Sequence, residues 1–145
     1  MGLVPMKVFL SHKNPDKTFV RDVKATLEAL GFEAWLDEDA MPAGVQLERG
    51  LQAGMKASCA AVFFLTPNFS DEAYLAAEID YAIGEKRTRG DAFSIISLVL
   101  PKDGSTPPVP NLLRPYVWKQ PSSDLEALRE ILRALPVKVG EVRLR

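Results

Sequence analysis

Short apolar runs alternate with amphipathic stretches along the whole chain. The runs predict strands at residues 7–11, 32–36, 60–65 and 93–100, with a short edge strand at 116–118. The run at 60–65 (AAVFFL) is continuously apolar, as in a strand that is buried on both faces. The pattern is typical of an α/β fold, and it predicts a doubly wound, flavodoxin-like parallel sheet of five strands with helices on both faces.

The amphipathic stretches predict the helices. The first is capped at Asp16 and stopped by Gly31, since helices often end at a residue that tolerates the left-handed conformation. The second is marked by apolar residues at every fourth position, Leu47, Leu51 and Met55. The third runs from about Ser70 to Arg87. The last is capped by Ser123 or Asp124, and its expected inward residues are Leu125, Leu128, Ile131 and Leu132.

Two segments with proline interrupt this order and are expected to be irregular. One is the polar loop Asp37–Gly44, and the other is Pro101–Pro115, which holds five prolines. A chain of 145 residues is one domain's worth of polypeptide. We expect that domain to span residues 1–136. The short, alternating, basic segment 137–145 is then an edge segment or the start of a linker to a further domain.

Composition removes several classes of protein. Basic and acidic residues number 18 and 19. A protein that binds nucleic acid directly, mainly through contacts to the phosphate backbone, normally has an excess of basic residues, so this class is disfavoured. The single cysteine, Cys59, cannot form an internal disulfide, and we expect it to be buried and inert. The single histidine, His12, cannot build a histidine-rich metal centre, and no metal site is predicted.

No membrane or export signal is evident in the sequence. The longest apolar run, Cys59–Leu65, has seven residues, whereas a span needs roughly twenty. The first ten residues lack the long apolar stretch and small-residue cleavage site of a signal peptide. We therefore expect a cytoplasmic protein without a membrane partner.

Polar residues follow three of the predicted strands. They are Ser11, His12 and Lys13 after the first strand, the loop from Asp37 after the second, and the segment from Thr66 to Ser70 after the third. In doubly wound folds, ligands bind beyond the carboxyl ends of the strands. Any chemistry is expected at this edge of the sheet.

Four segments together resemble the Toll/interleukin-1 receptor (TIR) domain family, in the family's order and spacing. They are VFLSH at 8–12, GFEAWLD at 31–37, FFLTPNFS at 63–70 and YLAAE at 74–78. The compact spacing is similar to that of bacterial members. The chain departs from the family pattern at His12, where Tyr is common, at Tyr74, where Trp is usual, and at Leu75, where Cys is usual.

The resemblance implies an enzyme that cleaves NAD+ between ribose and nicotinamide, giving nicotinamide and ADP-ribose or a cyclic form. NAD+ is then the substrate, and no cofactor is needed. Nicotinamide in NAD+ is already positively charged, so it can leave without a general acid. One carboxylate beside the ribose is chemically sufficient, whereas ordinary glycosidases need two.

Glu78 is the expected catalytic carboxylate. On a helical wheel it lies about 100° from Ile79, the centre of the predicted buried face, and thus at the boundary between core and surface. From spacing alone, a solvated helix glutamate is the simpler interpretation. The resemblance favours the catalytic one, because Glu78 is the acid of the YLAAE segment.

Six residues are candidates for binding the substrate: Ser11, His12, Lys13, Trp35, Ser70 and Tyr74. Trp35 can stack on nicotinamide or adenine, or it can be core. His12 and Lys13 precede a helix and suit a pyrophosphate, although a loop histidine and a surface lysine are the plain alternatives. Ser11 and Ser70 can contact the ligand or cap local structure.

The resemblance also implies self-association through TIR–TIR contacts, with an assembly loop that contains Asp39, Met41, Pro42 and Gly44. An isolated domain is then expected to be weakly active and mostly monomeric. The resemblance further implies a fused sensor domain, for example for a nucleotide second messenger, and a role in antiphage defence.

Two other functions stay open from the sequence. One is a non-catalytic signalling or scaffold module that works by TIR–TIR assembly. The other is an enzyme similar to nucleoside deoxyribosyltransferases, which have a similar fold and also use a helix glutamate.

Overall fold

The computed structural model describes residues 6–12, 17–36, 47–67 and 73–136. The strands are β1 (Lys7–Ser11), β2 (Glu33–Leu36), β3 (Ser58–Leu65), β4 (Ser94–Val99) and β5 (Trp118–Lys119). The helices are α1 (Lys17–Ala29), α3 (Leu47–Ala57), α4 (Ala73–Arg89) and α5 (Asp124–Ala134). Short 3₁₀ turns lie at Gly90–Ala92 and Asn111–Leu113.

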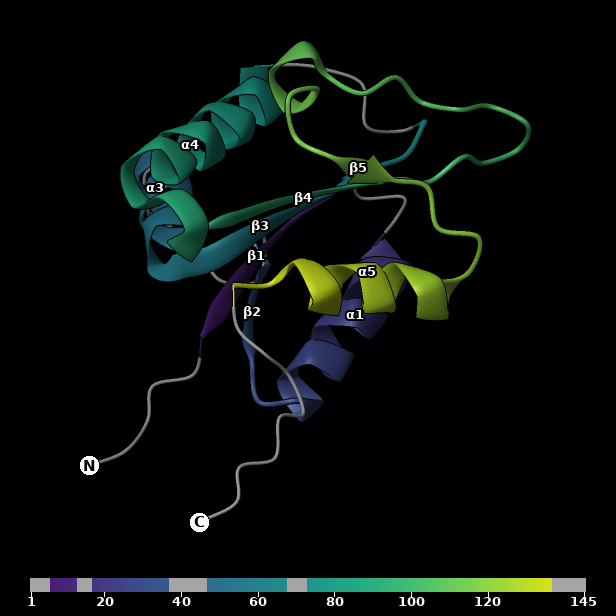
Figure 1. The fold of residues 1–145 in the computed structure, drawn as a ribbon, viewed down its shortest axis with the longest axis horizontal. Coiled ribbons are helices and arrows are strands. Elements are labelled where there is room, and N and C mark those ends of the chain that lie inside the picture. The colour runs from purple at the N-terminus through teal and green to yellow at the C-terminus, as the bar shows by residue number, and fades with distance from the viewer. Residues whose placement is uncertain (1–5, 13–16, 37–46, 68–72, 137–145) are drawn as a thin grey trace.

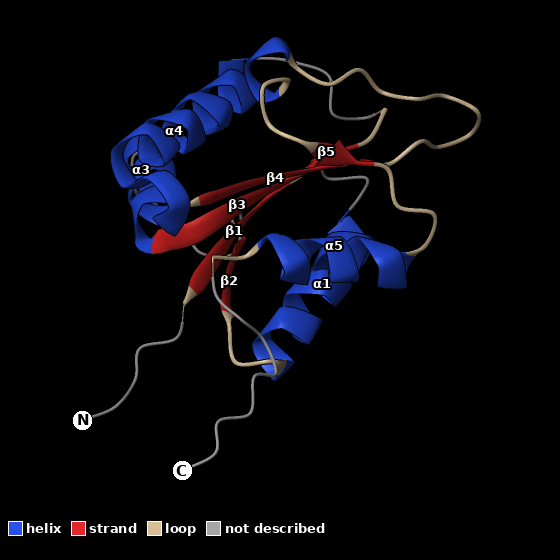
Figure 2. Cartoon of the chain, viewed as in Figure 1, coloured by secondary structure: helices blue, strands red, loops and turns tan. Residues whose placement is uncertain are grey.

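The strands form one parallel sheet in the order β2-β1-β3-β4-β5 (Figure 2). Helices α3 and α4 cover one face, and α1 and α5 cover the other (Figure 1). The predicted fold class, a doubly wound five-stranded parallel sheet between helices, is confirmed. The carboxyl ends of β1, β3 and β4 therefore meet at one edge.

Each face of the sheet holds its own apolar layer, because successive strand residues point to opposite sides. On one side, Val8 and Leu10 of β1 pack with α1 and α5. On the other, Phe9 packs with α3 and α4. Strand β3 is buried along its whole length, as its continuous apolar sequence predicts.

Two predicted helix ends are confirmed in detail. Gly31 follows α1 with a φ of +96°, and the backbone N–H of Phe32 returns to Leu27 O at 3.0 Å. At α5, the Ser123 hydroxyl caps the helix by accepting from Glu126 N at 3.1 Å. Both residues act where the backbone would otherwise leave polar groups unsatisfied.

The prediction that Leu125 points inward is wrong. Its side chain is 77% exposed, while Ala127 and Ile131 form the buried face of α5. Leu125 lies about 160° from Ala127 at 100° per residue, so one helix face cannot bury both. Strand boundaries also differ from the prediction: β3 begins earlier, at Ser58, and β5 holds only Trp118 and Lys119. Strands β2 and β4 are each slightly shorter than predicted.

Cys59 is buried in β3, as predicted. Burial raises the pKa of its thiol above the ordinary value, and this outweighs the nearby positive charge of Arg89. Among the described helices, none is both long and apolar enough to cross a bilayer.

Candidate functional site

The carboxylate of Glu78 is enclosed between helix α4 and the carboxyl end of β1. Glu78 is only 2% exposed, and Ser11, the last residue of β1, is fully buried. The Ser11 hydroxyl Oγ donates a hydrogen bond to Glu78 Oε2. Two residues that lie 67 positions apart in the chain thus form one polar contact inside an apolar layer.

Strand alternation explains the direction of Ser11. Phe9 faces α3 and α4, so Ser11, two positions later, points to the same side. The register pairs Ser11 with Phe63 on β3, which lies in the middle of the sheet. The hydroxyl therefore sits at the end of a central strand and under the helices.

Packing of α4 explains the burial of Glu78. Its neighbour Ile79 and the residue one turn on, Ala82, both belong to the apolar layer on this face. The wheel placed Glu78 at the boundary of core and surface, partly desolvated. In the structure it is almost fully buried instead, because this end of α4 lies close over the end of β1.

A carboxylate inside an apolar layer needs hydrogen-bond donors, since burial of an unpaired charge is strongly unfavourable. The Ser11 hydroxyl supplies one of them. Hydrogen bonds to an ionised acceptor are stronger than those between neutral groups. The contact also fixes the direction in which the Glu78 carboxylate points.

Trp35 lies on the same side of the sheet and is only partly buried. Its indole stacks on Phe9 of the neighbouring strand, with ring centroids 4.8 Å apart and planes at 17°. The backbone of α3 also comes close, since a Cβ on Gly54 would lie 2.6 Å from Trp35 Cε2. Trp35 therefore joins β1, β2 and α3, and contact with a substrate stays a prediction.

The structure describes only some of the remaining predicted site residues. His12 follows Ser11 directly and is partly buried at the same edge of the sheet. Tyr74 belongs to the first turn of α4, four residues before Glu78, but its side chain lies outside the described part. Also outside the described residues are Lys13, Ser70, Asp39, Met41, Pro42 and Gly44.

Two residues that support this site were not predicted from the sequence. Phe9 and Gly54 hold the indole of Trp35 in place. The sequence does contain a signal for Gly54, because a glycine inside a helix lowers helix stability by about 1 kcal/mol relative to alanine. Such a residue often marks a close approach of another group.

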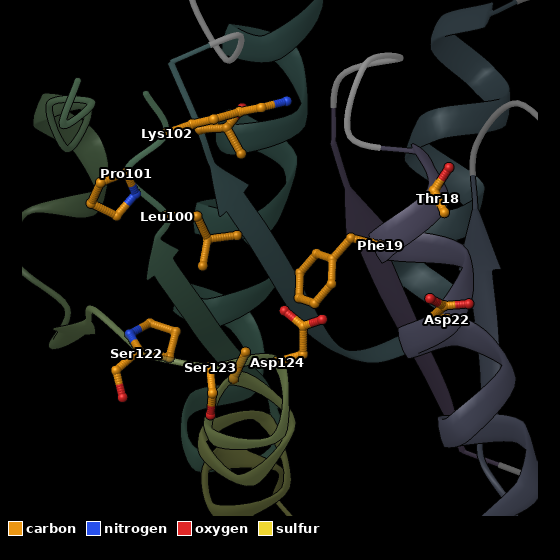
Figure 3. Close-up of a pocket in the computed structure, with 12 residues that line it drawn as sticks. Thr18, Phe19, Asp22, Leu100, Pro101, Lys102, Ser122, Ser123 and Asp124 are labelled. Carbon is orange, nitrogen blue, oxygen red and sulfur yellow. The ribbon is translucent and has the colours of Figure 1, made fainter. Parts of the chain in front are cut away.

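A pocket of about 510 Å³ lies on the opposite face of the sheet, between α1, α5 and the ends of β3 and β4. Figure 3 shows Phe19 reaching from α1 across this pocket towards Leu100. None of its lining residues is among the predicted catalytic or substrate-binding residues, although Thr66 begins one of the segments at which chemistry was expected. It is separated from Glu78 by the sheet itself.

Residues 8–132 match the family model described as the TIR domain. The chain belongs to the TIR domain family. The match includes residues of all five strands and both Ser11 and Glu78, and it confirms the resemblance found in the sequence.

This TIR domain is similar to three bacterial proteins over about half its length. It is 33% identical over 76 residues to "NAD(+) hydrolase TcpC" of Escherichia coli, covering 52% of this chain and 25% of the relative. It is 31% identical over 77 residues to "NAD(+) hydrolase PdTIR" of Paracoccus denitrificans, covering 52% and 26%.

The third relative is "2' cyclic ADP-D-ribose synthase AbTIR" of Acinetobacter baumannii, 31% identical over 74 residues, with 50% of this chain and 28% of the relative covered. The matched part of this TIR domain thus spans only about a quarter of the length of these curated relatives.

Solved structures support the fold of this TIR domain. The TIR domains of the activated Roq1 resistosome match with a TM-score of 0.55 and 19% identity, over 64% of this chain and 57% of that chain. The CMP N-glycosidase BcmB of Clostridium botulinum matches with a TM-score of 0.60 and 18% identity, over 86% and 97%. At such identities the likeness concerns the fold alone.

Proposed function

We propose that this TIR domain is an NAD+ glycohydrolase and that Glu78 is its catalytic carboxylate. The observation that carries the proposal is the buried Glu78 carboxylate, held by the Ser11 hydroxyl at the carboxyl edge of the sheet. The names of the bacterial relatives, two NAD+ hydrolases and one cyclic ADP-ribose synthase, support the same reaction class.

The proposed reaction breaks the bond between C1′ of the ribose and the nicotinamide nitrogen. The bonding electron pair passes to the ring nitrogen, so the cationic pyridinium leaves as neutral nicotinamide. The ribose develops the positive charge of an oxocarbenium-like transition state. Water then bonds to C1′ and releases a proton, which gives ADP-ribose, while attack by a group of the same molecule gives a cyclic form.

Glu78 suits the stabilisation of that positive charge. Its carboxylate is held in place before the substrate binds, so little reorganisation is needed as the charge develops. Burial lowers the local dielectric constant and strengthens the attraction between carboxylate and cation. A group that is exposed to solvent would act more weakly at the same distance.

The substrate contacts belong to the proposal as well. We assign the dinucleotide to the edge where β1 and β2 end, near His12, Lys13 and Trp35. Tyr74 and Ser70 complete the set from the start of α4 and the segment before it. In this arrangement the ribose lies nearest Glu78, and the pyrophosphate lies nearest His12 and Lys13.

Self-assembly is the proposed means of activation, through the loop that contains Asp39, Met41, Pro42 and Gly44. We further propose that residues 1–136 form the TIR domain of a cytoplasmic antiphage protein, and that residues 137–145 are its C-terminal tail or the start of a linker to a sensor domain. A light-scattering titration run in parallel with the activity assay tests the assembly step. Full activity of stable monomers would contradict it.

The activity is tested by incubating the purified protein with NAD+ and separating the products by chromatography. We expect nicotinamide together with ADP-ribose or its cyclic form. The rate per molecule of protein should rise with protein concentration. Glu78→Gln should lower the rate by about a hundredfold or more, as loss of a main electrostatic group does. Asp80→Asn is the matched control, because Asp80 is exposed on the same helix.

Equal rates for the wild type and Glu78→Gln would remove Glu78 from the reaction. A wild type that consumes no NAD+ even when concentrated or crowded would favour the non-catalytic TIR–TIR module. Transfer of deoxyribose between bases, without NAD+ consumption, would favour the transferase-like alternative.

A further inference from the structure

The pocket between α1 and α5 has the composition of a small-molecule site. Its floor is apolar and includes Leu100, Pro121 and the buried Ala127. Polar and charged side chains stand around that floor, as in ligand sites where a few groups fix the orientation. It opens beyond the carboxyl ends of β3 and β4, the edge at which doubly wound folds bind ligands.

Phe19 gives this pocket a fixed aromatic wall. Its ring packs edge-to-face with Phe64 of β3, with centroids 5.8 Å apart and planes at 88°. Figure 3 shows the ring projecting from α1 towards Asp124, which stands at the start of α5. A flat ligand can therefore lie against Phe19 without first ordering it.

The charges around the pocket are unbalanced. Asp22 and Asp124 contribute two carboxylates, and Lys102 contributes one ammonium group. Both aspartates are exposed, and neither carboxylate has a hydrogen bond or ion pair among the described residues. The neighbouring hydroxyls of Ser122 and Ser123 are engaged with Glu126 instead. The two carboxylates are therefore available to a ligand.

An anionic ligand fits this arrangement poorly. Lys102 and the N-terminal end of α5 would both attract an anion. However, Asp124 already stands in the first turn of α5, and Asp22 adds a second negative charge across the pocket. A cation is attracted by both carboxylates and also by the face of an aromatic ring.

We infer that this pocket binds a compact planar organic cation, an amidinium or guanidinium group on a small flat body. The carboxylates of Asp22 and Asp124 accept its N–H groups, and its flat body packs on Phe19. The site is distinct from Glu78 and does not depend on the proposed NAD+ chemistry.

The test uses a matched pair of probes, benzamidine and benzamide, which share their shape and differ in charge. Each is titrated into the whole chain, and binding is followed by calorimetry and by the backbone amide signals of Thr66 and Leu100 in NMR spectra. We expect benzamidine to bind at millimolar concentrations and benzamide to bind about tenfold more weakly. Added salt should weaken the binding of benzamidine, because exposed ion pairs are screened.

Variants identify the groups that bind the probe. Asp22→Asn and Asp124→Asn should each lower the affinity for benzamidine about threefold, and the double variant should lower it about tenfold, as expected for exposed charge pairs. Phe19→Leu should also weaken it, whereas Lys102→Met should tighten it. Asp80→Asn and Glu78→Gln are controls that should leave the affinity unchanged.

Several results would overturn this inference. They are the absence of benzamidine binding at millimolar concentrations, equal affinity for benzamide, and unchanged affinity in the double aspartate variant. Loss of benzamidine binding in Glu78→Gln would assign the probe to the other face of the sheet. Binding of inorganic phosphate that Lys102→Met abolishes would make the pocket an anion site.

Discussion

The indole of Trp35 lies against the backbone of helix α3 at Gly54. A Cβ built on Gly54 would lie 2.6 Å from Trp35 Cε2 and 2.7 Å from Cζ2. Real Cβ atoms do not approach other atoms so closely, so only glycine permits this contact. Since the ring is also stacked on Phe9, the spacing between α3 and the sheet depends on this glycine.

Gly54→Ala should therefore destabilise the protein, although alanine is the better helix former. The clash is expected to cost about 1–3 kcal/mol, which exceeds the helix gain of about 1 kcal/mol. Gly84→Ala on α4 is the matched control, because a Cβ there meets nothing within 4 Å. It should stabilise the protein, and urea denaturation compares the two. Two variants of equal stability would contradict the proposed close contact.

Ser11→Ala should lower NAD+ cleavage, because it removes the hydroxyl that donates to Glu78. A hydrogen bond to a charged group contributes about 1.5–3 kcal/mol, which corresponds to roughly a tenfold to hundredfold loss of kcat. KM should change much less, since Ser11 acts through Glu78. Steady-state kinetics measures both constants.

Ser97→Ala is the control for this prediction. Ser97 is also a buried strand serine, but its hydroxyl makes no hydrogen bond within the described part of the chain. Its replacement should leave kcat unchanged. Full activity of Ser11→Ala, or an equal loss of activity in both variants, would contradict the proposed positioning role of Ser11.

Arg89→Met should destabilise the protein by about 2 kcal/mol or more, since the Arg89 guanidinium joins several groups. It donates to Ser58 O at 2.7 Å, pairs with Glu85 at 3.0 Å and lies 4.6 Å over the ring of Phe93. Arg89→Lys should recover little, because a point charge cannot reproduce the planar contacts. Thermal denaturation measures both.

Arg87→Met is the comparison for Arg89, because Arg87 is exposed on the same helix. Its melting temperature should stay close to that of the wild type. A similar small effect at both positions would show that the contacts of Arg89 contribute little to stability.

Alkaline pH should reduce the contribution of Cys59 to stability. Burial raises the thiol pKa in the folded protein above its ordinary value of 9.0, so the folded state favours the protonated form. Stability from this group is complete below the unfolded pKa and is lost as the pH rises through the folded pKa. The melting temperature of the wild type should fall more steeply above about pH 9 than that of Cys59→Ala. Parallel pH profiles would contradict this.

Much of the fold could be predicted because the relevant signals are local. The continuous apolar run of β3 and the cap at Ser123 each depend on neighbours in the chain. Leu125 lies about 20° from Leu132 on the helical wheel, so the helical period alone predicts that the two are buried together. Which side of α5 is buried depends on where the sheet lies, and the period of the helix does not contain that information.

The candidate site divides in the same way. The resemblance carried by the YLAAE segment led to the proposal of Glu78, whereas the helical period alone favoured a solvated glutamate. The predicted order of strands and helices led to the proposal of the carboxyl edge of the sheet. The hydrogen bond from Ser11, the approach of Gly54 to Trp35 and the pocket beside Phe19 emerged only from packing. Each joins segments far apart in the chain. The distances between those segments depend on how the helices pack on the sheet, which no local sequence pattern encodes.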